Sequence, residues 1–347
     1  MDRMKAPFEV PSRIARKQIK ASTTYLTRLF IPPPLMDPIR RVKFDMFPFL
    51  RVCDDGHVER LLGTTVVLPS LDPATGVSSK DVVINPSTGL SARLYLPPTN
   101  PSSQQKLLPL LVYYHGGAFC IESAASPTYH HYLNSIASEA SIAIVSVEYR
   151  RAPEHLLPIA YDDSLEALIW AVKGHAEPWL RDHVDPARVF LAGDSAGANI
   201  CHNIAMRSGG GGVRIEGVVL VHPYFWGSTE TTEALSEEER AKREGVWRFV
   251  CPTSKGVDDP RVNPLAEGAL SLAGLGSERV LVCEAEKDFL RGRGRTYYEG
   301  LKRSGWKGTA EFVETEGEGH VFHLFNPGCE SAKVLMKRLV SFFNNDK

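Results

Sequence analysis

The chain has 347 residues, with 40 basic and 41 acidic side chains and a formal net charge of −1, and 43% of its residues are hydrophobic. A disordered chain would have fewer apolar residues and a larger charge imbalance. A protein that binds nucleic acid by neutralising phosphates would be basic overall or would carry a basic domain. The sequence has no run of about 18 apolar residues, the length that spans a membrane. We therefore expect a globular protein of one large domain or two small ones, without a membrane span.

The first 35 residues differ from the rest of the chain. They contain many Arg, Lys, Ser and Thr residues, and their only acidic residues are Asp2 and Glu9. Such a composition is typical of an organelle transit peptide and also of a poorly ordered N-terminal extension. We expect residues 1–35 to be an extension, disordered or targeting, with the functional chain starting at Met36. The expected location is the cytoplasm, with a plastid or mitochondrion as the alternative if this segment is a transit peptide.

The six cysteines are widely scattered, and their spacing matches neither a disulfide framework nor a metal-binding motif. They are Cys53, Cys120, Cys201, Cys251, Cys283 and Cys329. We expect most of them to be buried as small apolar side chains, in a reducing compartment.

From residue 107 onward, short apolar runs alternate with helical patterns. The expected strands are residues 107–114, 141–149, 189–192, 217–224, 279–284 and 310–314, and the expected helices are 161–173, 292–304 and 330–343. Continuous apolar runs indicate strands that are covered on both faces, as in a parallel sheet. The alternation predicts an α/β fold with a doubly wound, mostly parallel sheet and helices on both faces. The polar residues 228–244 interrupt this pattern and predict an amphipathic insertion over the C-terminal edge of the sheet.

The pentapeptide Gly193-Asp194-Ser195-Ala196-Gly197 follows one predicted strand directly and precedes a helical pattern. A serine on such a strand-to-helix turn has its hydroxyl raised above the sheet edge, as the nucleophile of an acyl-transfer enzyme requires. Glycines on both sides allow the close backbone approach that the turn imposes. The alternative is a plain glycine-rich turn with a helix-capping serine. We predict that Ser195 is a nucleophile.

A second glycine-containing motif, His115-Gly116-Gly117-Ala118-Phe119, follows the predicted strand at residues 107–114. Backbone N–H groups that glycine leaves uncovered can stabilise a carbonyl oxygen as it becomes an oxyanion. We therefore assign an oxyanion hole to the N–H groups of Gly116, Gly117 and Ala196. His115 is expected to hold the shape of this loop rather than to act as a base.

Serine is a weak nucleophile at its ordinary acidity, so it needs a histidine base and a carboxylate that orients the base. In this fold the acid and then the histidine follow later strands. Asp288 and His320 have that order and follow the predicted strands 279–284 and 310–314. Other candidates are less favoured: Asp258 and Asp259 are expected to form a turn, Asp162 and Asp163 to cap a helix, and Asp194 to have a structural role. His323 lies three residues beyond His320, inside the expected start of the next segment.

Seven ordered motifs resemble the plant carboxylesterase branch of the hormone-sensitive-lipase group of α/β-hydrolases. They read HGGAF, SVEYRRAPEH, YDDSLEALIW, GDSAGAN, VHPYF, DDPRVNP and GHVFH, and the resemblance covers residues 36–345. It implies an α/β-hydrolase domain over residues 36–347, with a small helical cap built from N-terminal helices (about 36–60) and an insertion (about 228–255). It also implies triad roles for Ser195, Asp288 and His320. The gibberellin receptors of this group lack the catalytic histidine, whereas His320 is present here.

The predicted activity is that of a serine carboxylesterase acting on short-to-medium acyl esters or small aromatic and plant-metabolite esters. The alternatives are a dehydratase or transesterase on a plant secondary metabolite and, less favoured, a gibberellin-receptor-like binding protein. Aromatic side chains at strand ends are candidates for an apolar pocket: Phe119, Tyr224, Phe225, Trp226 and Phe322. We expect no cofactor and no metal. We also expect no nucleic-acid partner, because the basic turn from Arg291 to Arg295 is interpreted as a solvated surface. The expected assembly is a monomer or a weak homodimer.

Overall fold

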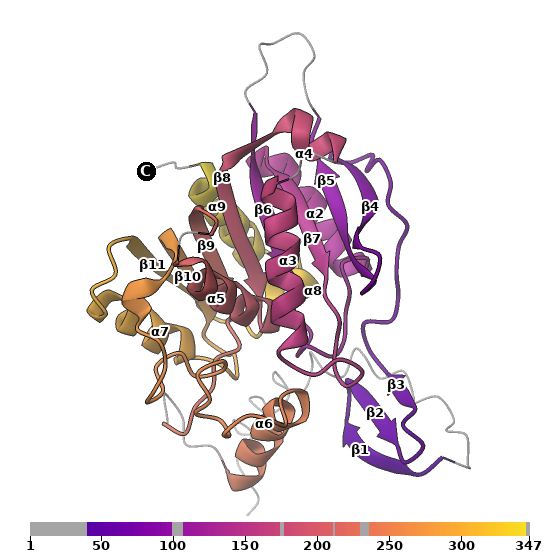
Figure 1. Ribbon diagram of the computed structural model, residues 1–347, viewed down its shortest axis with the longest axis vertical. Coiled ribbons are helices and arrows are strands. Elements are labelled where there is room, and N and C mark those ends of the chain that lie inside the picture. The colour runs from indigo at the N-terminus through magenta and orange to yellow at the C-terminus, as the bar shows by residue number, and fades with distance from the viewer. Residues whose placement is uncertain (1–39, 99–106, 174–176, 211, 230–235, 345–347) are drawn as a thin grey trace, which may run out of the picture.

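An eight-stranded sheet forms the centre of the molecule in the computed structural model, which describes residues 40–98, 107–173, 177–210, 212–229 and 236–344 (Figure 1). Its strand order is β11-β10-β9-β8-β6-β7-β5-β4. The strands are β4 (Ser78–Asn85), β5 (Leu90–Leu96), β6 (Leu108–Tyr114), β7 (Ala143–Glu148), β8 (Val184–Asp194), β9 (Ile215–Val221), β10 (Ser277–Ala285) and β11 (Thr309–Thr315). The predicted extension over residues 1–35 lies outside the described residues.

The six strands expected from the apolar runs are β6 to β11, and they pair with one another in parallel. The mostly parallel sheet is therefore confirmed. Strands β4 and β5 were not expected, and they pair antiparallel at one edge of the sheet. The burial pattern of β4 contains no fully buried residue, which explains why an apolar run does not mark this edge strand.

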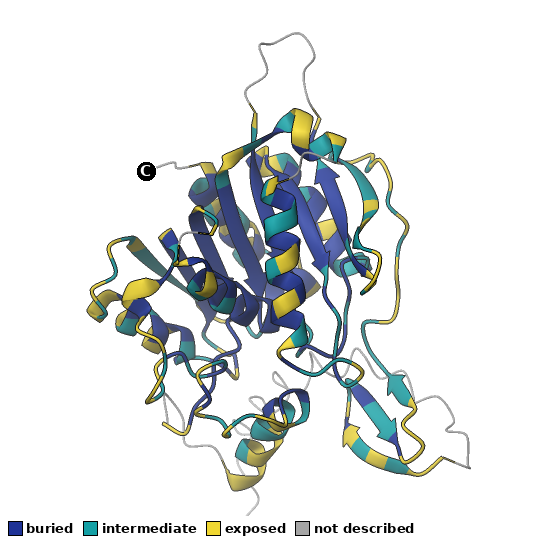
Figure 2. Ribbon diagram, viewed as in Figure 1, coloured by how far each residue is buried: buried dark blue, intermediate teal, exposed yellow. Residues whose placement is uncertain are grey.

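Helices cover both faces of the sheet. On one face lie α2 (Pro127–Ala140), α8 (Phe322–Phe325) and α9 (Glu330–Asn344); on the other lie α3 (Ile159–Lys173), α5 (Ala196–Ser208) and α7 (Arg293–Arg303). The short helix α4 (Pro178–His183) precedes β8. Successive residues of β6 alternate between the two cores: Leu110 and Val112 pack on the α3–α5 side, and Leu111 and Tyr113 pack on the α2–α9 side. Figure 2 shows the resulting layer of buried strands between helices with exposed outer surfaces.

A second, three-stranded antiparallel sheet is formed by β1 (Val42–Met46), β2 (Leu50–Cys53) and β3 (Val58–Arg60). It lies at the same end of the molecule as α6 (Glu237–Val250), beyond one end of the large sheet (Figure 1). The rings of Phe44 and Phe249 stack at 4.2 Å between these two segments. Helix α6 lies within the segment expected to form the insertion, and it begins with a capping box at Ser236. The resemblance implied N-terminal helices, but the described residues between 40 and 60 form strands instead.

All six cysteines are unpaired, and five of them are buried, as expected for small apolar side chains. Within the residues that the structure describes, no helix is both long and apolar enough to span a bilayer.

Candidate active site

Ser195 lies where β8 ends and α5 begins, with a backbone φ of 52° and ψ of −116°. This region of φ is unfavourable for a residue with a side chain, and such strain persists where the surrounding structure holds it in place. The Ser195 N–H donates to the Val221 carbonyl at 2.9 Å, and its carbonyl accepts from the Tyr224 N–H at 2.9 Å. A Cβ on Gly193 would lie 2.5 Å from the carbonyl carbon of Gly197. The turn therefore requires glycine beside a strained, firmly held serine.

Ser195, His320 and Asp288 form one hydrogen-bonded chain. The Oγ of Ser195 is 3.0 Å from Nε2 of His320, and Nδ1 of His320 is 2.7 Å from Oδ2 of Asp288. Asp288 follows β10 and His320 follows β11, so three strand ends at one edge of the sheet supply the three groups. The contact to the carboxylate requires a proton on Nδ1, which leaves Nε2 able to accept the proton of the serine hydroxyl.

The local environment moves the pKa values of Asp288 and His320 further apart. Burial lowers the pKa of His320, but the charge and hydrogen bond of Asp288 raise it more, so that it lies above its ordinary value of 6.5. Burial raises the pKa of Asp288, and the charge and hydrogen bond of His320 outweigh this effect and lower it below 3.8. Asp288 is thus ionised wherever His320 titrates, and it stabilises the charged imidazole.

The structure corrects the expected role of Gly116. Its N–H donates to the Tyr129 hydroxyl at 2.8 Å and to Oδ1 of Asp194 at 3.2 Å, so it is already satisfied inside the protein. Asp194 also accepts from the hydroxyls of Tyr113 and Tyr129, at 2.7 and 2.9 Å. Burial raises the pKa of Asp194 to about 6, although these hydrogen bonds lower it. Gly116 and Asp194 therefore form hydrogen bonds inside the protein, and the Gly116 N–H is not free to bind a substrate.

The N–H groups of Gly117, Ala118 and Ala196 have no hydrogen-bond acceptor in the described part of the chain. Gly117 and Ala118 have φ values of 104° and 53°, and consecutive N–H groups in such a turn can converge on one anion. Ala118 was not expected to take part. Ala118 belongs to the HGGAF motif, but only the glycine residues of this motif were expected to leave their backbone N–H groups uncovered.

His115 is fully buried and has a structural role, as expected. Its Nδ1 donates to the Gly116 carbonyl at 2.7 Å, and its ring stacks on Tyr149 at 4.3 Å. Burial lowers the pKa of His115 to about 3, so its ring is neutral. The Tyr149 hydroxyl in turn donates to the His115 carbonyl at 2.8 Å.

His222 is a further residue that the sequence did not single out, although it belongs to the VHPYF motif. Its Nδ1 accepts the N–H of Val321, the residue after His320, at 2.8 Å, and lies 3.7 Å from Oδ2 of Asp288. His222, Asp288 and His320 present ligand atoms close enough to hold a metal ion. The atoms concerned are already engaged, however: His222 Nδ1 by the Val321 N–H, and His320 Nδ1 by Asp288. The three groups therefore fit a proton-transfer site better than a metal site.

The rival carboxylates of Asp162, Asp163, Asp258 and Asp259 are engaged elsewhere. Asp163 pairs with Arg150 and Asp162 with Arg207. Asp259 pairs with Arg261, while Asp258 accepts from Ser228 and Asn263 in a turn. His323 is buried among aromatic rings, and neither of its ring nitrogens has a hydrogen-bond partner among the residues that the structure describes.

The five aromatic residues expected to line a pocket are all buried: Phe119, Tyr224, Phe225, Trp226 and Phe322. Phe225 packs against Tyr297 and His202, within the core on the α5–α7 side. The aromatic ring that lies against the candidate base is instead Phe289, whose side chain is 45% exposed and whose centroid is 4.7 Å from that of His320. Phe289 directly follows Asp288 in the sequence, and this adjacency indicates that its ring lies near the triad.

The basic turn does not form an open cationic surface. Arg291 and Arg295 both pair with Glu314, at 2.6 and 2.9 Å, and Arg293 donates to the Gly227 carbonyl at 3.1 Å. Two surface hollows of about 290 and 350 Å³ lie at the end of α5 remote from Ser195, near Ser208, so neither belongs to this site.

Comparison with known proteins agrees with this geometry. The model of a family described by its α/β-hydrolase fold matches residues 111–324. The chain is 48% identical to a probable carboxylesterase 2 of Arabidopsis thaliana, over 88% of this chain and 97% of that one. It is 47% identical to a 2-hydroxyisoflavanone dehydratase of Glycyrrhiza echinata, over 87% and 96%.

A solved structure with the same architecture is that of a hyperthermophilic esterase from the archaeon Pyrobaculum calidifontis. It superposes with a TM-score of 0.63 at 28% identity, covering 77% of this chain and 85% of the other. These likenesses agree with the strand-end positions of Ser195, Asp288 and His320. The chain belongs to the α/β-hydrolase family, in the plant carboxylesterase branch of the hormone-sensitive-lipase group.

Proposed function

We propose that the chain is a serine carboxylesterase in which Ser195, His320 and Asp288 are the catalytic residues. The observation that carries the proposal is the continuous chain of contacts from Ser195 Oγ through His320 to Asp288 Oδ2, at 3.0 and 2.7 Å. The N–H groups of Gly117, Ala118 and Ala196 are the donors of the oxyanion hole in this proposal. A nucleophile, a base, an orienting acid and oxyanion donors are what acyl transfer requires.

Acylation begins when His320 Nε2 takes the proton from Ser195 and Oγ attacks the ester carbonyl carbon. The carbonyl oxygen becomes an oxyanion and accepts hydrogen bonds from the three backbone N–H groups. The charged imidazole is stabilised by Asp288, which remains ionised because its pKa is held low. His320 then protonates the leaving alcohol as the carbon–oxygen bond breaks, and an acyl-serine remains.

Deacylation repeats the same proton transfers with water as the nucleophile. His320 removes a proton from water, the hydroxide attacks the acyl carbon, and the proton is returned to Ser195 Oγ as the acid leaves. In this proposal both half-reactions use the same three side chains, Ser195, His320 and Asp288, whose contacts at 3.0 and 2.7 Å support it.

The substrates in this proposal are short-to-medium acyl esters or small aromatic esters. In this proposal the cap comes from two segments, about residues 36–60 and about 228–255, whose described parts contain the small sheet β1–β3 and helix α6. Phe44 and Phe249 join these parts, and Phe289 presents an apolar ring beside His320. Apolar walls with a few polar groups suit small organic esters.

The test is hydrolysis of p-nitrophenyl acetate together with labelling by a fluorophosphonate probe. The wild type is expected to release p-nitrophenol and to be labelled at Ser195, and Ser195→Ala is expected to do neither. Asn203→Ala is a matched control on α5, because the Asn203 side-chain amide donates to Asn199 and to the Arg261 carbonyl and to no triad residue that the structure describes. Turnover by Ser195→Ala at the wild-type rate would overturn the nucleophile assignment.

A second candidate function is dehydration of a hydroxylated flavonoid, favoured by the likeness to the 2-hydroxyisoflavanone dehydratase. Product analysis separates the two functions, since a dehydratase releases water from one substrate and forms no acid and alcohol. A protein that binds a ligand without labelling or turnover would instead favour a receptor role.

We further propose a cytoplasmic location and a monomeric or weakly dimeric state. Fusion of a fluorescent protein to the full chain and to a chain lacking residues 1–35 tests the location. Plastid import that requires residues 1–35 would favour the transit-peptide alternative. Sedimentation over a range of concentrations tests the assembly.

A further inference from the structure

The loop that supplies two of the proposed oxyanion donors is held in an unfavourable backbone conformation. The N–H of Cys120 donates to the Gly117 carbonyl at 2.9 Å, which closes a four-residue turn. The two central residues of this turn, Ala118 and Phe119, have φ values of 53° and 61°. Glycine or asparagine is usual at such positions, and a non-glycine residue held there is strained. The surrounding protein must therefore hold this turn in place.

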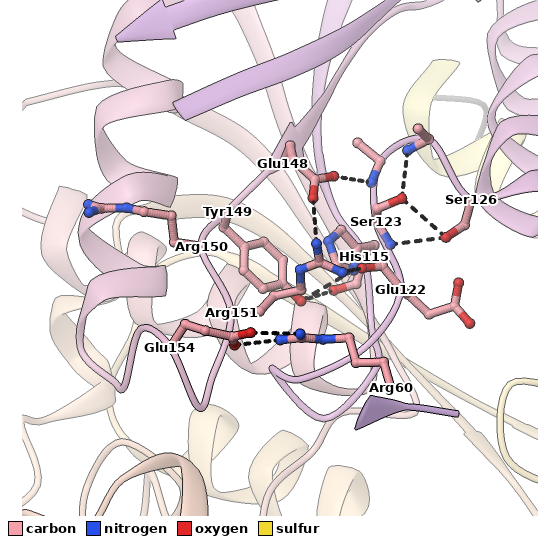
Figure 3. A network of polar contacts seen from close by, with 12 residues as sticks. Arg60, His115, Glu122, Ser123, Ser126, Glu148, Tyr149, Arg150, Arg151 and Glu154 are labelled. Carbon is pink, nitrogen blue, oxygen red and sulfur yellow. Dashed lines mark hydrogen bonds and ion pairs between the residues drawn. The ribbon is translucent and has the colours of Figure 1, made fainter. Parts of the chain in front are cut away.

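Arg60, the last residue of β3, makes the contacts that hold the end of the turn, and Figure 3 shows its side chain beside Glu154. Its Nε donates to the Cys120 carbonyl at 2.7 Å, and its Nη2 donates to the Ala152 carbonyl at 3.1 Å. The Ala152 N–H donates to the Phe119 carbonyl at 2.9 Å. One guanidinium thus fixes Cys120 directly and Phe119 through Ala152.

Glu154 orients this guanidinium. Its two carboxylate oxygens accept from Nη1 and Nη2 of Arg60 at 2.8 and 2.6 Å, a bidentate geometry that fixes the plane of the group. The hydrogen bond from Arg60 holds the pKa of Glu154 below its usual range, so the pair stays charged. The Arg60 side chain is only 19% exposed, and solvent competes little for its donors.

A second arginine–glutamate pair holds the following residues of the loop (Figure 3). Arg151 pairs with Glu148 at 3.1 Å and donates to the Glu122 carbonyl, and Glu148 accepts the Ala124 N–H at 2.6 Å. This pair comes from the end of β7 in the large sheet, whereas Arg60 comes from the small sheet. Arg60 therefore links the small sheet to the oxyanion loop.

We propose that Arg60 is a positioning residue for catalysis: it ties β3 of the small sheet to the turn at residues 117–120 and thereby keeps the N–H groups of Gly117 and Ala118 aimed at the oxyanion. The inference rests on the proposed esterase function. Arg60 acts through the Cys120 carbonyl, so its loss changes transition-state stabilisation more than substrate binding. A displacement of about 1 Å in such a site can reduce the rate on the order of 10².

The test compares Arg60→Gln, Arg60→Lys and Glu154→Gln with the wild type in the hydrolysis of p-nitrophenyl acetate. For Arg60→Gln we expect kcat to fall at least about tenfold and KM to change less than about twofold, as for loss of an interaction made in the transition state. The pH midpoint of kcat/KM is expected to stay unchanged, because the triad is untouched. Arg60→Lys is expected to recover part of the loss, since one ammonium cannot reach all the acceptors. Glu154→Gln is expected to show a smaller loss in the same direction.

Arg214→Gln is the matched control, because Arg214 also pairs with a glutamate, Glu278, and donates to a carbonyl, that of Ala187, near the start of β9. Its kcat is expected to stay within about twofold of the wild type. Hydrogen exchange of residues 117–122 provides a readout that does not depend on activity, and we expect it to be faster in Arg60→Gln. A wild type that hydrolyses no ester would contradict the proposed function, and the exchange measurement would still decide the role of Arg60. Wild-type kcat, or wild-type exchange in this loop, in Arg60→Gln would overturn the inference.

Discussion

Gly197 lies against the carbonyl of Tyr114 so closely that a Cβ on Gly197 would be 1.9 Å from the Tyr114 oxygen. Tyr114 ends β6 and Gly197 is in the first turn of α5, so this contact sets how close the helix comes to the neighbouring strand. Ser195 lies at the start of the same helix, so its strained backbone conformation depends on this close packing of α5 against β6.

Gly197→Ala is therefore expected to lower the free energy of unfolding by at least about 1–3 kcal/mol, because backbone rather than a flexible side chain must move. Chemical denaturation measures the change. Gly245→Ala is the control: nothing lies within 4 Å of a Cβ at Gly245 in α6, so alanine is expected to be neutral or stabilising there. Equal stability of the two variants would contradict the close contact.

The activity is expected to fall on the acid side as His320 becomes protonated, because only the neutral imidazole can accept the serine proton. The pKa of His320 lies above 6.5, so kcat/KM should rise with pH with a midpoint above that value. Asp288→Asn removes the charge that raises this pKa while burial still lowers it, and the midpoint should shift to lower pH. The rate is expected to fall on the order of 10⁴ as well, since the tautomer is no longer fixed. A pH–rate profile of both proteins measures this, and an unshifted midpoint would argue against the coupling.

Tyr129→Phe removes the hydroxyl that accepts from the Gly116 N–H and donates to Oδ2 of Asp194. We expect a loss of about 1–3 kcal/mol in stability, the effect of leaving buried polar groups without a partner. The hydroxyl lowers the pKa of Asp194, which is about 6, and therefore stabilises the ionised form. The loss should be larger above pH 6 than below it.

Thermal unfolding at several pH values tests the prediction for Tyr129. Tyr298→Phe is the control, since the Tyr298 hydroxyl has no hydrogen-bond partner within the described residues. A pH-independent loss in Tyr129→Phe would contradict the link to Asp194.

Phe289→Ala removes the exposed ring beside His320 and is expected to raise KM for aromatic esters several-fold, with a smaller effect on acetate esters. Apolar contact of about 25 cal/mol per Å² is lost where the substrate would rest on the ring. Phe325→Ala, at a ring that is 64% exposed, should leave KM unchanged. An unchanged KM in Phe289→Ala would show that substrates bind elsewhere.

The strands and the order of the candidate catalytic residues could be predicted from the sequence because local signals mark them. Apolar runs such as 217–224 and 279–284 are long enough to require burial on both faces, and a serine between glycines after such a run can occupy few other turns. Edge strand β4 was missed because half-exposed residues there produce no apolar run. The three strands of the small sheet were missed because the resemblance pointed to helices.

The sequence by itself determined which residue types are present and in what order: a serine turn, an acid after β10 and a histidine after β11. Only the tertiary structure decided which backbone N–H groups remain open. Gly116 appeared available in the sequence, but Tyr129 and Asp194 occupy its N–H. The link from Arg60 to Cys120 joins residues 60 positions apart. Hydrogen bonds over such separations depend on how the chain returns on itself, and no local pattern encodes which donor finds which acceptor.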